Sequence, residues 1–289
     1  MTQVTNPTQP ASSLAGGVGG GGFTVLGTTG DSRLSGSSGS DIIVTFAGAD
    51  AIAGGSGNEL IISGGGNDSV GGGDGNDTII SGSGSDVVAG GTGDDFLFGG
   101  KGDDLVDGGD GNDLISGDRG NDTVLGGSGS DTVFGGQGND VVGGGDGNDT
   151  LYGGKDNDTV NGGSGNDLIS GDRGSDVLTG GAGSDTFYFF SSGGEYGVDT
   201  ITDFTPTEDK IKLKTTSGGV FSGLGTSLDQ TEFVVVSNFN PATPGSTTTN
   251  KLVYDQATGA LYFNGTSGVL TVAQLQPGLT ITTNNFELF

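Results

Sequence analysis

Large apolar residues recur every nine positions along more than half of the chain. When residues 36–188 are cut into nonapeptides, the eighth position is a large apolar residue in all 17 of them, from Ile43 to Phe187. The sixth position is acidic in all 17, and the fourth is glycine in 16, with Asp156 as the exception. Residues 27–35 form a degenerate copy. A fixed period of nine predicts a repeat protein rather than a disordered glycine-rich chain.

Each nonapeptide combines a glycine-rich turn with a short strand. Glycines at positions 1, 2 and 4 permit positive φ and close backbone approach, so we expect the first six residues to turn. The last three residues, such as Thr-Ile-Ile, are rich in β-branched types and too few for a helix. Because side chains alternate along a strand, position 8 should point inward and positions 7 and 9 outward.

Two nonapeptides then complete one coil of 18 residues. The predicted fold class is all-β: a right-handed parallel β-roll with two facing sheets of short strands, followed by a β-rich C-terminal cap. We divide the chain into a flexible N-terminal segment (1–26), the roll (27–188) and a C-terminal cap region (189–289). Within the cap region, residues 198–204, 208–213 and 233–236 read as strands. Residues 251–264 read as a β-hairpin around a glycine-containing turn.

Composition excludes several classes of protein. The chain has 66 glycines but only 6 prolines, too few for collagen. Its net charge of −27 would repel nucleic acid and opposes compaction. Because it lacks Cys and His, disulfides, zinc fingers and Ser–His or Cys–His nucleophilic pairs are excluded. The N-terminus has no basic residue before Arg33 and no apolar core, so we expect no secretory signal peptide there, and we expect no transmembrane segment anywhere.

The pattern G-G-x-G-x-D-x-U-x resembles that of the RTX, or haemolysin-type calcium-binding, family. The resemblance implies that the turns of nonapeptides i and i+2 stack on one edge and clamp Ca²⁺ between Asp carboxylates and turn carbonyls. Ca²⁺ prefers six to eight oxygen ligands, which carboxylates and carbonyls supply. The implied metal ligands are the position-6 acids: Asp41, Asp50, Glu59, Asp68, Asp77, Asp86, Asp95, Asp104, Asp113, Asp122, Asp131, Asp140, Asp149, Asp158, Asp167, Asp176 and Asp185.

Counting the gaps between stacked turns gives the number of ions. Nine turns on one edge leave eight gaps and eight turns on the other leave seven, so about fifteen Ca²⁺ ions are expected. Residues 36–188 carry 26 acids and 4 bases, a net charge of −22, which these ions would neutralise. We therefore expect the chain to be largely unfolded without calcium and to fold on binding it.

The two edges and the two faces of the predicted roll differ. Position 3 is acidic at Asp74, Asp110 and Asp146 on one edge, whereas the other edge carries Lys101, Arg119, Lys155 and Arg173. One sheet face is richer in large apolar residues, including Phe96, Phe98 and Phe134. This face is a candidate surface for self-association or for packing against the C-terminal region. Two nearly identical stretches, 108–125 and 162–179, share an Asp-Arg-Gly turn at Asp118 and Asp172.

The resemblance extends past the repeats. The residues DTITDF followed by EDKIKL are similar to the segment that ends RTX rolls, which implies further ligands at Asp199, Asp203 and Asp209. RTX proteins carry an uncleaved C-terminal signal for type I secretion, and the C-terminal residues LTITTNNFELF look like one. The expected partners are therefore calcium and the type I secretion machinery, and the expected location is secreted, extracellular or on the cell surface.

Our first functional hypothesis is a non-enzymatic extracellular calcium-binding roll, a component of a surface layer, matrix or adhesion system. Only 26 to 35 polar residues precede the roll, too few for a catalytic domain or a pore. The alternatives are a secreted toxin, an enzyme-associated RTX module lacking its effector domain, and a calcium-dependent ice-binding roll. An enzyme within 214–289 is disfavoured by the absence of His, Cys and a nucleophile elbow.

Overall fold

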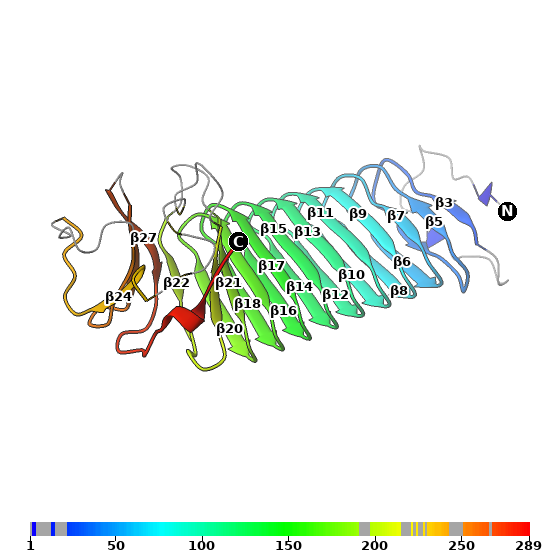
Figure 1. Ribbon diagram of the computed structural model, residues 1–289. Coiled ribbons are helices and arrows are strands. Elements are labelled where there is room, and N and C mark those ends of the chain that lie inside the picture. Colours follow the sequence, from blue (N-terminus) through cyan, green and yellow to red (C-terminus); the bar gives the residue numbers. More distant parts are fainter. Residues whose placement is uncertain are drawn as a thin grey trace. The chain divides into compact units, whose positions relative to one another are not determined.

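A computed structural model of the protein describes residues 2–3, 13–14, 22–190, 197–214, 221, 224, 228, 230–242, 251–265 and 268–289 (Figure 1). The chain divides into two compact units, residues 1–151 and 152–289, and each is described by itself. Strands dominate both units, and the described residues contain one 3₁₀ turn and no α-helix. Of the predicted flexible segment 1–26, residues 2–3, 13–14 and 22–26 are described, and residues 24–26 form a strand; the rest lies outside the described residues.

Strands of the first unit alternate between two parallel sheets (Figure 1). Two-residue strands at the N-terminus, β1 (Thr2–Gln3) and β2 (Ser13–Leu14), pair with β3 and β4. Three-residue strands follow: β3 (Thr24–Leu26), β4 (Arg33–Ser35), β5 (Ile42–Val44) and β7 (Leu60–Ile62). The others have six residues: β6 (Ala51–Ser56), β8 (Ser69–Asp74), β9 (Thr78–Ser83), β10 (Val87–Thr92), β11 (Phe96–Lys101), β12 (Leu105–Asp110), β13 (Leu114–Arg119), β14 (Thr123–Ser128), β15 (Thr132–Gln137) and β16 (Val141–Asp146).

The strand register confirms the coil of eighteen residues. Phe96 of β11 lies opposite Thr78 of β9 on one side and Leu114 of β13 on the other, in parallel pairs. Odd-numbered strands from β3 to β15 form one sheet of this unit, and even-numbered strands from β4 to β16 form the other. The expected parallel β-roll with two sheets is therefore confirmed.

Most strands are longer than the predicted three residues. Positions 1 to 3 of the next nonapeptide continue the strand, as where Gly91 of β10 pairs with Gly73 of β8, so the turn is confined to positions 4 to 6. Glycine permits this because it has no Cβ: a Cβ on Gly91 would overlap the carbonyl oxygen of Gly73. The prediction of a six-residue turn was wrong because these glycines allow close strand pairing as well as turning.

A single row of position-8 side chains forms the core of each sheet. Ile61, Ile79 and Leu97 are fully buried, with 0% of their surface exposed, and their neighbours in the row are at most 5% exposed. The prediction for position 8 is confirmed. Each strand contributes one large side chain to the core, so burial of apolar surface per residue is low for a domain of this length.

The outward positions 7 and 9 expose apolar side chains on both sheets. Phe96 is 49% exposed and Phe134 is 37% exposed on the first sheet. Val87 and Leu105 on the second sheet are exposed to a similar degree, 48% and 42%. The contrast in exposure between the two faces is therefore smaller than their residue types suggest. Self-association through the first face stays a prediction.

The second unit continues the same architecture and then changes it. Its six-residue strands are β17 (Thr150–Lys155, which contains the division between units), β18 (Thr159–Ser164), β19 (Leu168–Arg173) and β20 (Val177–Ala182). β21 (Thr186–Phe189), β22 (Asp199–Ile201) and β23 (Lys210–Leu213) follow, with β22 beside β20 and β23 beside β21 in parallel pairs. Strands are thus confirmed within both predicted segments, at residues 199–201 of 198–204 and at residues 210–213 of 208–213, and they extend the two sheets.

The C-terminal strands form a mixed region. β24 (Phe233–Val236) pairs in parallel with β25 (Lys251–Asp255), which forms an antiparallel hairpin with β26 (Ala260–Gly265) as predicted. β27 (Gly268–Gln274) joins β26 to β22. A 3₁₀ turn, η2 (Thr283–Asn285), leads into β28 (Phe286–Leu288), which pairs with β23. In the described part of the chain, no helix has the length and apolarity needed to cross a membrane.

Candidate functional site

All 17 predicted ligand acids are buried. Each precedes the first residue of a strand, and none exposes more than 3% of its surface. A buried acidic side chain at every turn is unusual, because ionised carboxylates are rarely buried without a partner. The turns therefore contain two rows of buried carboxyl groups, one along each edge.

Backbone hydrogen bonds hold these carboxyl groups in register. The N–H of Asp77 donates to Oδ1 of Asp95 at 2.7 Å, and the N–H of Asp95 donates to Oδ1 of Asp113 at 2.8 Å. The same pattern runs along the other edge, where the N–H of Asp86 donates to Oδ1 of Asp104 at 2.8 Å. Each acid thus reaches back to the turn one coil earlier, and we call each row an aspartate ladder.

The ladders extend beyond the regular repeats. In the second unit the N–H of Asp176 donates to Oδ1 of Asp199, and the N–H of Asp185 donates to Oδ1 of Asp209, both at 3.0 Å. These bonds place Asp199 and Asp209 on the ladders. Asp203 lies elsewhere: its carboxylate accepts hydrogen bonds from the N–H groups of Gly180 and Gly181.

The second oxygen of most ladder acids has no partner. Among the described residues, Oδ2 of fourteen ladder aspartates and both carboxylate oxygens of Glu59 are buried without a hydrogen bond. An unpartnered buried carboxylate oxygen carries a large desolvation cost, so a repeated one indicates a missing positive partner. A cation would satisfy these oxygens.

Glycine at position 1 leaves room beside most of the unpartnered oxygens. The exceptions are those of Asp50, Asp68 and Asp86, where position 1 is Thr45, Ser63 and Ser81. A methyl group on Gly90 would overlap Oδ2 of Asp95 and would lie 2.6 Å from the carbonyl oxygen of Gly108 in the next coil. A carboxylate oxygen and a carbonyl oxygen therefore converge on the same small space. All-oxygen donors suit a hard cation such as Ca²⁺.

The ladder geometry limits how many carboxylates a cation could contact. In the described part of the chain, no three Asp or Glu side chains cluster as a metal-binding group. Most ligands at each step would therefore be carbonyl oxygens, and the acids would supply the charge. The donor set fits calcium, with position-6 acids and position-1 carbonyls as the residues that would hold it.

Burial changes the protonation of the ladder acids. Desolvation raises the pKa of Asp95 and of Asp104 to about 7, although backbone N–H donors oppose the rise. The pKa of Glu59 rises to about 8, first through burial and then through its contact with Asp77. Without a cation, burial therefore keeps these three carboxyl groups largely protonated up to about neutral pH.

We expect the calcium-free protein to gain β structure on acidification. In the folded state the pKa values of Asp95 and Asp104 are about 7, above the ordinary aspartate value of 3.8. Between these two pH values the folded state therefore holds protons that the unfolded state has lost. This contribution to stability is present below about pH 4 and is lost as pH rises through about 7. Circular dichroism of metal-stripped protein between pH 8 and pH 4 measures it, and constant β content across that range would contradict it. Calcium-loaded protein at pH 8 is the control.

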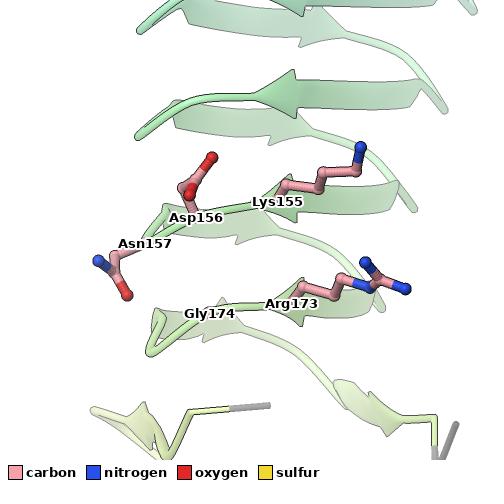
Figure 2. Close-up of a pocket in the computed structure, with 5 residues that line it drawn as sticks. All are labelled: Lys155, Asp156, Asn157, Arg173 and Gly174. Atoms are coloured by element: carbon pink, nitrogen blue, oxygen red, sulfur yellow. The ribbon is translucent and has the colours of Figure 1, made fainter. Parts of the chain in front are cut away.

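A shallow pocket lies on one edge of the second unit. It has a volume of about 250 Å³ and is lined by Lys155, Asp156, Asn157, Arg173 and Gly174. Figure 2 shows Lys155 and Arg173 extending on one side, with Asp156 and Asn157 on the other. No ladder acid lines the pocket, which mixes both signs of charge, but one lies next to it: a Cβ on Gly174 would be 2.9 Å from Oδ1 of Asp176.

The predicted difference between the two edges is visible in the register. Lys101 of β11 lies opposite Arg119 of β13, so two cations are neighbours on one sheet. On the other sheet Thr92 lies between Asp74 and Asp110. Thr92 Oγ1 donates to Oδ1 of Asp74 at 3.4 Å.

A second ladder was not predicted. At position 5 the N–H of Asn76 donates to Oδ1 of Asn58 at 3.1 Å, and the N–H of Asp94 donates to Oδ1 of Asn76 at 3.2 Å. These exposed bonds run in the opposite direction to those of the aspartate ladder. The signal was present in the sequence, because position 5 of the 17 nonapeptides contains only Asn, Asp, Ser and one Ala.

One comparison with known proteins, the match to a family model, agrees with this geometry. A family model described as the RTX calcium-binding nonapeptide repeat, in four copies, matches nine overlapping segments that together span residues 26–189. Among solved structures, the chain is similar to the extracellular lipase LipA from Serratia marcescens at 17% identity, with a TM-score of 0.20. That match covers 94% of this chain but 41% of the lipase chain, and at this TM-score it supports no further conclusion. The search of curated proteins found no match.

The family match covers more than half of the chain and coincides with the segment that contains the aspartate ladders. By its repeats, the chain belongs to the RTX calcium-binding nonapeptide repeat family.

Proposed function

We propose that this chain is a non-enzymatic, extracellular calcium-binding β-roll that acquires its fold when it binds calcium outside the cell. The observation that carries the proposal is the row of buried, unpartnered carboxylate oxygens along both ladders. A fold that repeats so costly a feature needs a cation at each step. The cation therefore acts as part of the structure, and the protein's role is that of a calcium-dependent scaffold.

Export supplies a reason for this dependence. The RTX repeats support passage through a type I secretion system, as is typical of such proteins. Cytosolic calcium is low, so the chain would remain unfolded and exportable inside the cell. Extracellular calcium-binding modules work at about 10⁻⁴ to 10⁻³ M, so the ladders would fill after export and folding would oppose return.

We propose about fifteen calcium ions per chain, the number of gaps between stacked turns. Support comes from the fifteen ladder acids, fourteen aspartates and Glu59, that have an unpartnered oxygen among the described residues. The ladder extension to Asp199 and Asp209 makes two further positions available in the second unit.

Ion counting tests the proposed function. Calcium-saturated protein, dialysed and analysed by atomic emission, is expected to hold about fifteen ions, and Asp95→Asn is expected to lose one or two of them because Asp95 borders two gaps in its ladder. Asp74→Asn is the matched control, because Asp74 is exposed at the end of β8 and should leave the count unchanged. Retention of two ions or fewer by the wild-type protein, or equal losses in both variants, would refute the proposal.

A further inference from the structure

Three aspartates of the roll occupy a backbone conformation that suits glycine: Asp156 at position 4, and Asp118 and Asp172 at position 2. The φ of Asp118 is 74° and that of Asp172 is 66°. The position-2 residues on the strands flanking Asp118 are Gly100 and Gly136, with φ of 107° and 122°. A non-glycine residue in this region is strained, and such strain is concentrated at functional sites. Stability alone would favour glycine at both positions.

A serine two residues earlier fixes each carboxylate. Ser116 Oγ donates to Oδ1 of Asp118 at 2.5 Å, and Ser170 Oγ donates to Oδ1 of Asp172 at 2.7 Å. The second oxygen of each carboxylate accepts no hydrogen bond from any described residue. Each aspartate therefore presents one negatively charged oxygen in a defined direction on the sheet.

Aromatic residues flank each of these aspartates. In the first unit Ser116 lies directly between Phe98 of β11 and Phe134 of β15. In the second unit burial raises the pKa of Tyr152 and of Tyr188, and the negative charge of Asp172 adds to both rises. Both tyrosines are thus within electrostatic reach of Asp172. We call these two arrangements the phenylalanine trough (Phe98, Ser116, Asp118, Phe134) and the tyrosine trough (Tyr152, Ser170, Asp172, Tyr188).

The spacing of each trough matches an organic cation. Aromatic residues two strands apart are separated by about 9.6 Å, so a group between them lies about 4.8 Å from each, within the roughly 6 Å reach of a cation–π contact. The carboxylate would supply the counter-charge. The phenylalanine rings offer no oxygen ligands, so a hard metal ion is disfavoured in the phenylalanine trough.

The same sheet of the second unit already uses this chemistry. Lys212 Nζ lies 5.1 Å from the ring centre of Phe289, and Lys214 Nζ lies 5.2 Å from that of Phe190. Lys212 is in β23, which pairs with the strand of Tyr188. The net charge of −27 would also concentrate cations near the surface.

We propose that the phenylalanine trough and the tyrosine trough each bind an organic cation: an ammonium, guanidinium or quaternary ammonium group. The proposal needs the folded roll but none of the ladder acids, so it goes beyond calcium binding. Because the repeated stretch supplies the Ser–Asp pair of both troughs, the chain would have two such sites.

Binding is tested on calcium-loaded protein with tetramethylammonium chloride against sodium chloride of equal ionic strength. The chain has five tyrosines and no tryptophan, so tyrosine fluorescence reports the tyrosine trough. We expect a saturable change with tetramethylammonium, none with sodium, and none with the neutral isostere 3,3-dimethylbutanol. Choline and arginine amide, as further probes, distinguish a quaternary ammonium from a guanidinium source. A change that is linear, or that sodium or the neutral isostere reproduces, would overturn the proposal.

Two variants locate the binding. Asp172→Gly is expected to weaken the fluorescence response at least tenfold, and it should fold as well as the wild type because glycine suits the backbone there. Asp118→Gly is the matched control: fluorescence should be retained while calorimetric stoichiometry falls from two to one. An unchanged response in Asp172→Gly with an intact circular dichroism spectrum would show that the trough is not the site.

Discussion

Removing calcium at pH 8 is expected to unfold the roll. About fifteen buried carboxylate oxygens would lose their partner, and each costs on the order of 1–3 kcal/mol or more when charged. The summed cost exceeds the roughly 5–15 kcal/mol by which domains are stable. The roll therefore cannot remain folded when these carboxylates are ionised and no cation is bound. Far-UV circular dichroism should show loss of β structure, and small-angle scattering should show the radius of gyration rising toward the ~60 Å of an unfolded chain of this length.

Magnesium is the control for this experiment. Mg²⁺ requires near-octahedral geometry and releases its waters reluctantly, so equal concentrations should fail to restore the roll. Re-addition of calcium should restore both signals. The same β content with and without a chelator at pH 8 would mean that the ladders are stable without a cation, which contradicts the proposed function.

Much of the fold was predictable because one physical constraint repeats in every coil. Position 8 is apolar in 17 consecutive nonapeptides. All these side chains can be buried on the same side of a sheet if each strand pairs with the strand eighteen residues away, as the strands of Phe96 and Thr78 do. The acid at position 6 is placed by the same register. Its burial follows because the turn is short and the side chain points toward the previous coil.

The strand length was not predictable from residue types alone. Glycines at positions 1 and 2 read as turn residues, because glycine is depleted in strands of ordinary proteins. In this chain the closely approaching backbones require glycine inside the strand, as at Gly91, where a Cβ would overlap the neighbouring carbonyl. The same residue type therefore has two roles, and only the register distinguishes them.

The troughs were also only partly visible in the sequence. The repeated Asp-Arg-Gly turns at Asp118 and Asp172 stood out, but the aromatic residues of each trough lie eighteen residues before and after Ser116 or Ser170. Phe98 is seen to lie beside Ser116 only once the strand register is known. The period of nine gives that register only when two nonapeptides are taken together as one coil. Positive φ at the two aspartates could not be read from the sequence, because position 2 also accepts Ser37 and Phe46 earlier in the chain.

Gly90→Ala is expected to disrupt one step of an aspartate ladder, whereas Gly71→Ala should be harmless. A methyl group on Gly90 would occupy the space beside Oδ2 of Asp95 and would lie 2.6 Å from the carbonyl oxygen of Gly108. Overpacking of this kind costs about 1–3 kcal/mol, and the displaced carboxylate also loses its cation. The calcium midpoint of folding should therefore shift to higher concentration, and the ion count should fall by one or two.

Gly71 is the matched control because it is also a glycine and lies in the neighbouring strand of the same sheet. A Cβ at Gly71 meets no atom within 4 Å, and its partner in register, Ala89, already carries one. Replacing such a glycine reduces the entropy of the unfolded chain, so stability should be unchanged or higher by about 0.4–1 kcal/mol. Calcium titrations of both variants, followed by circular dichroism, compare them directly. Equal midpoints would show that the space beside the carboxylate is not where the cation binds, since only Gly90 borders it.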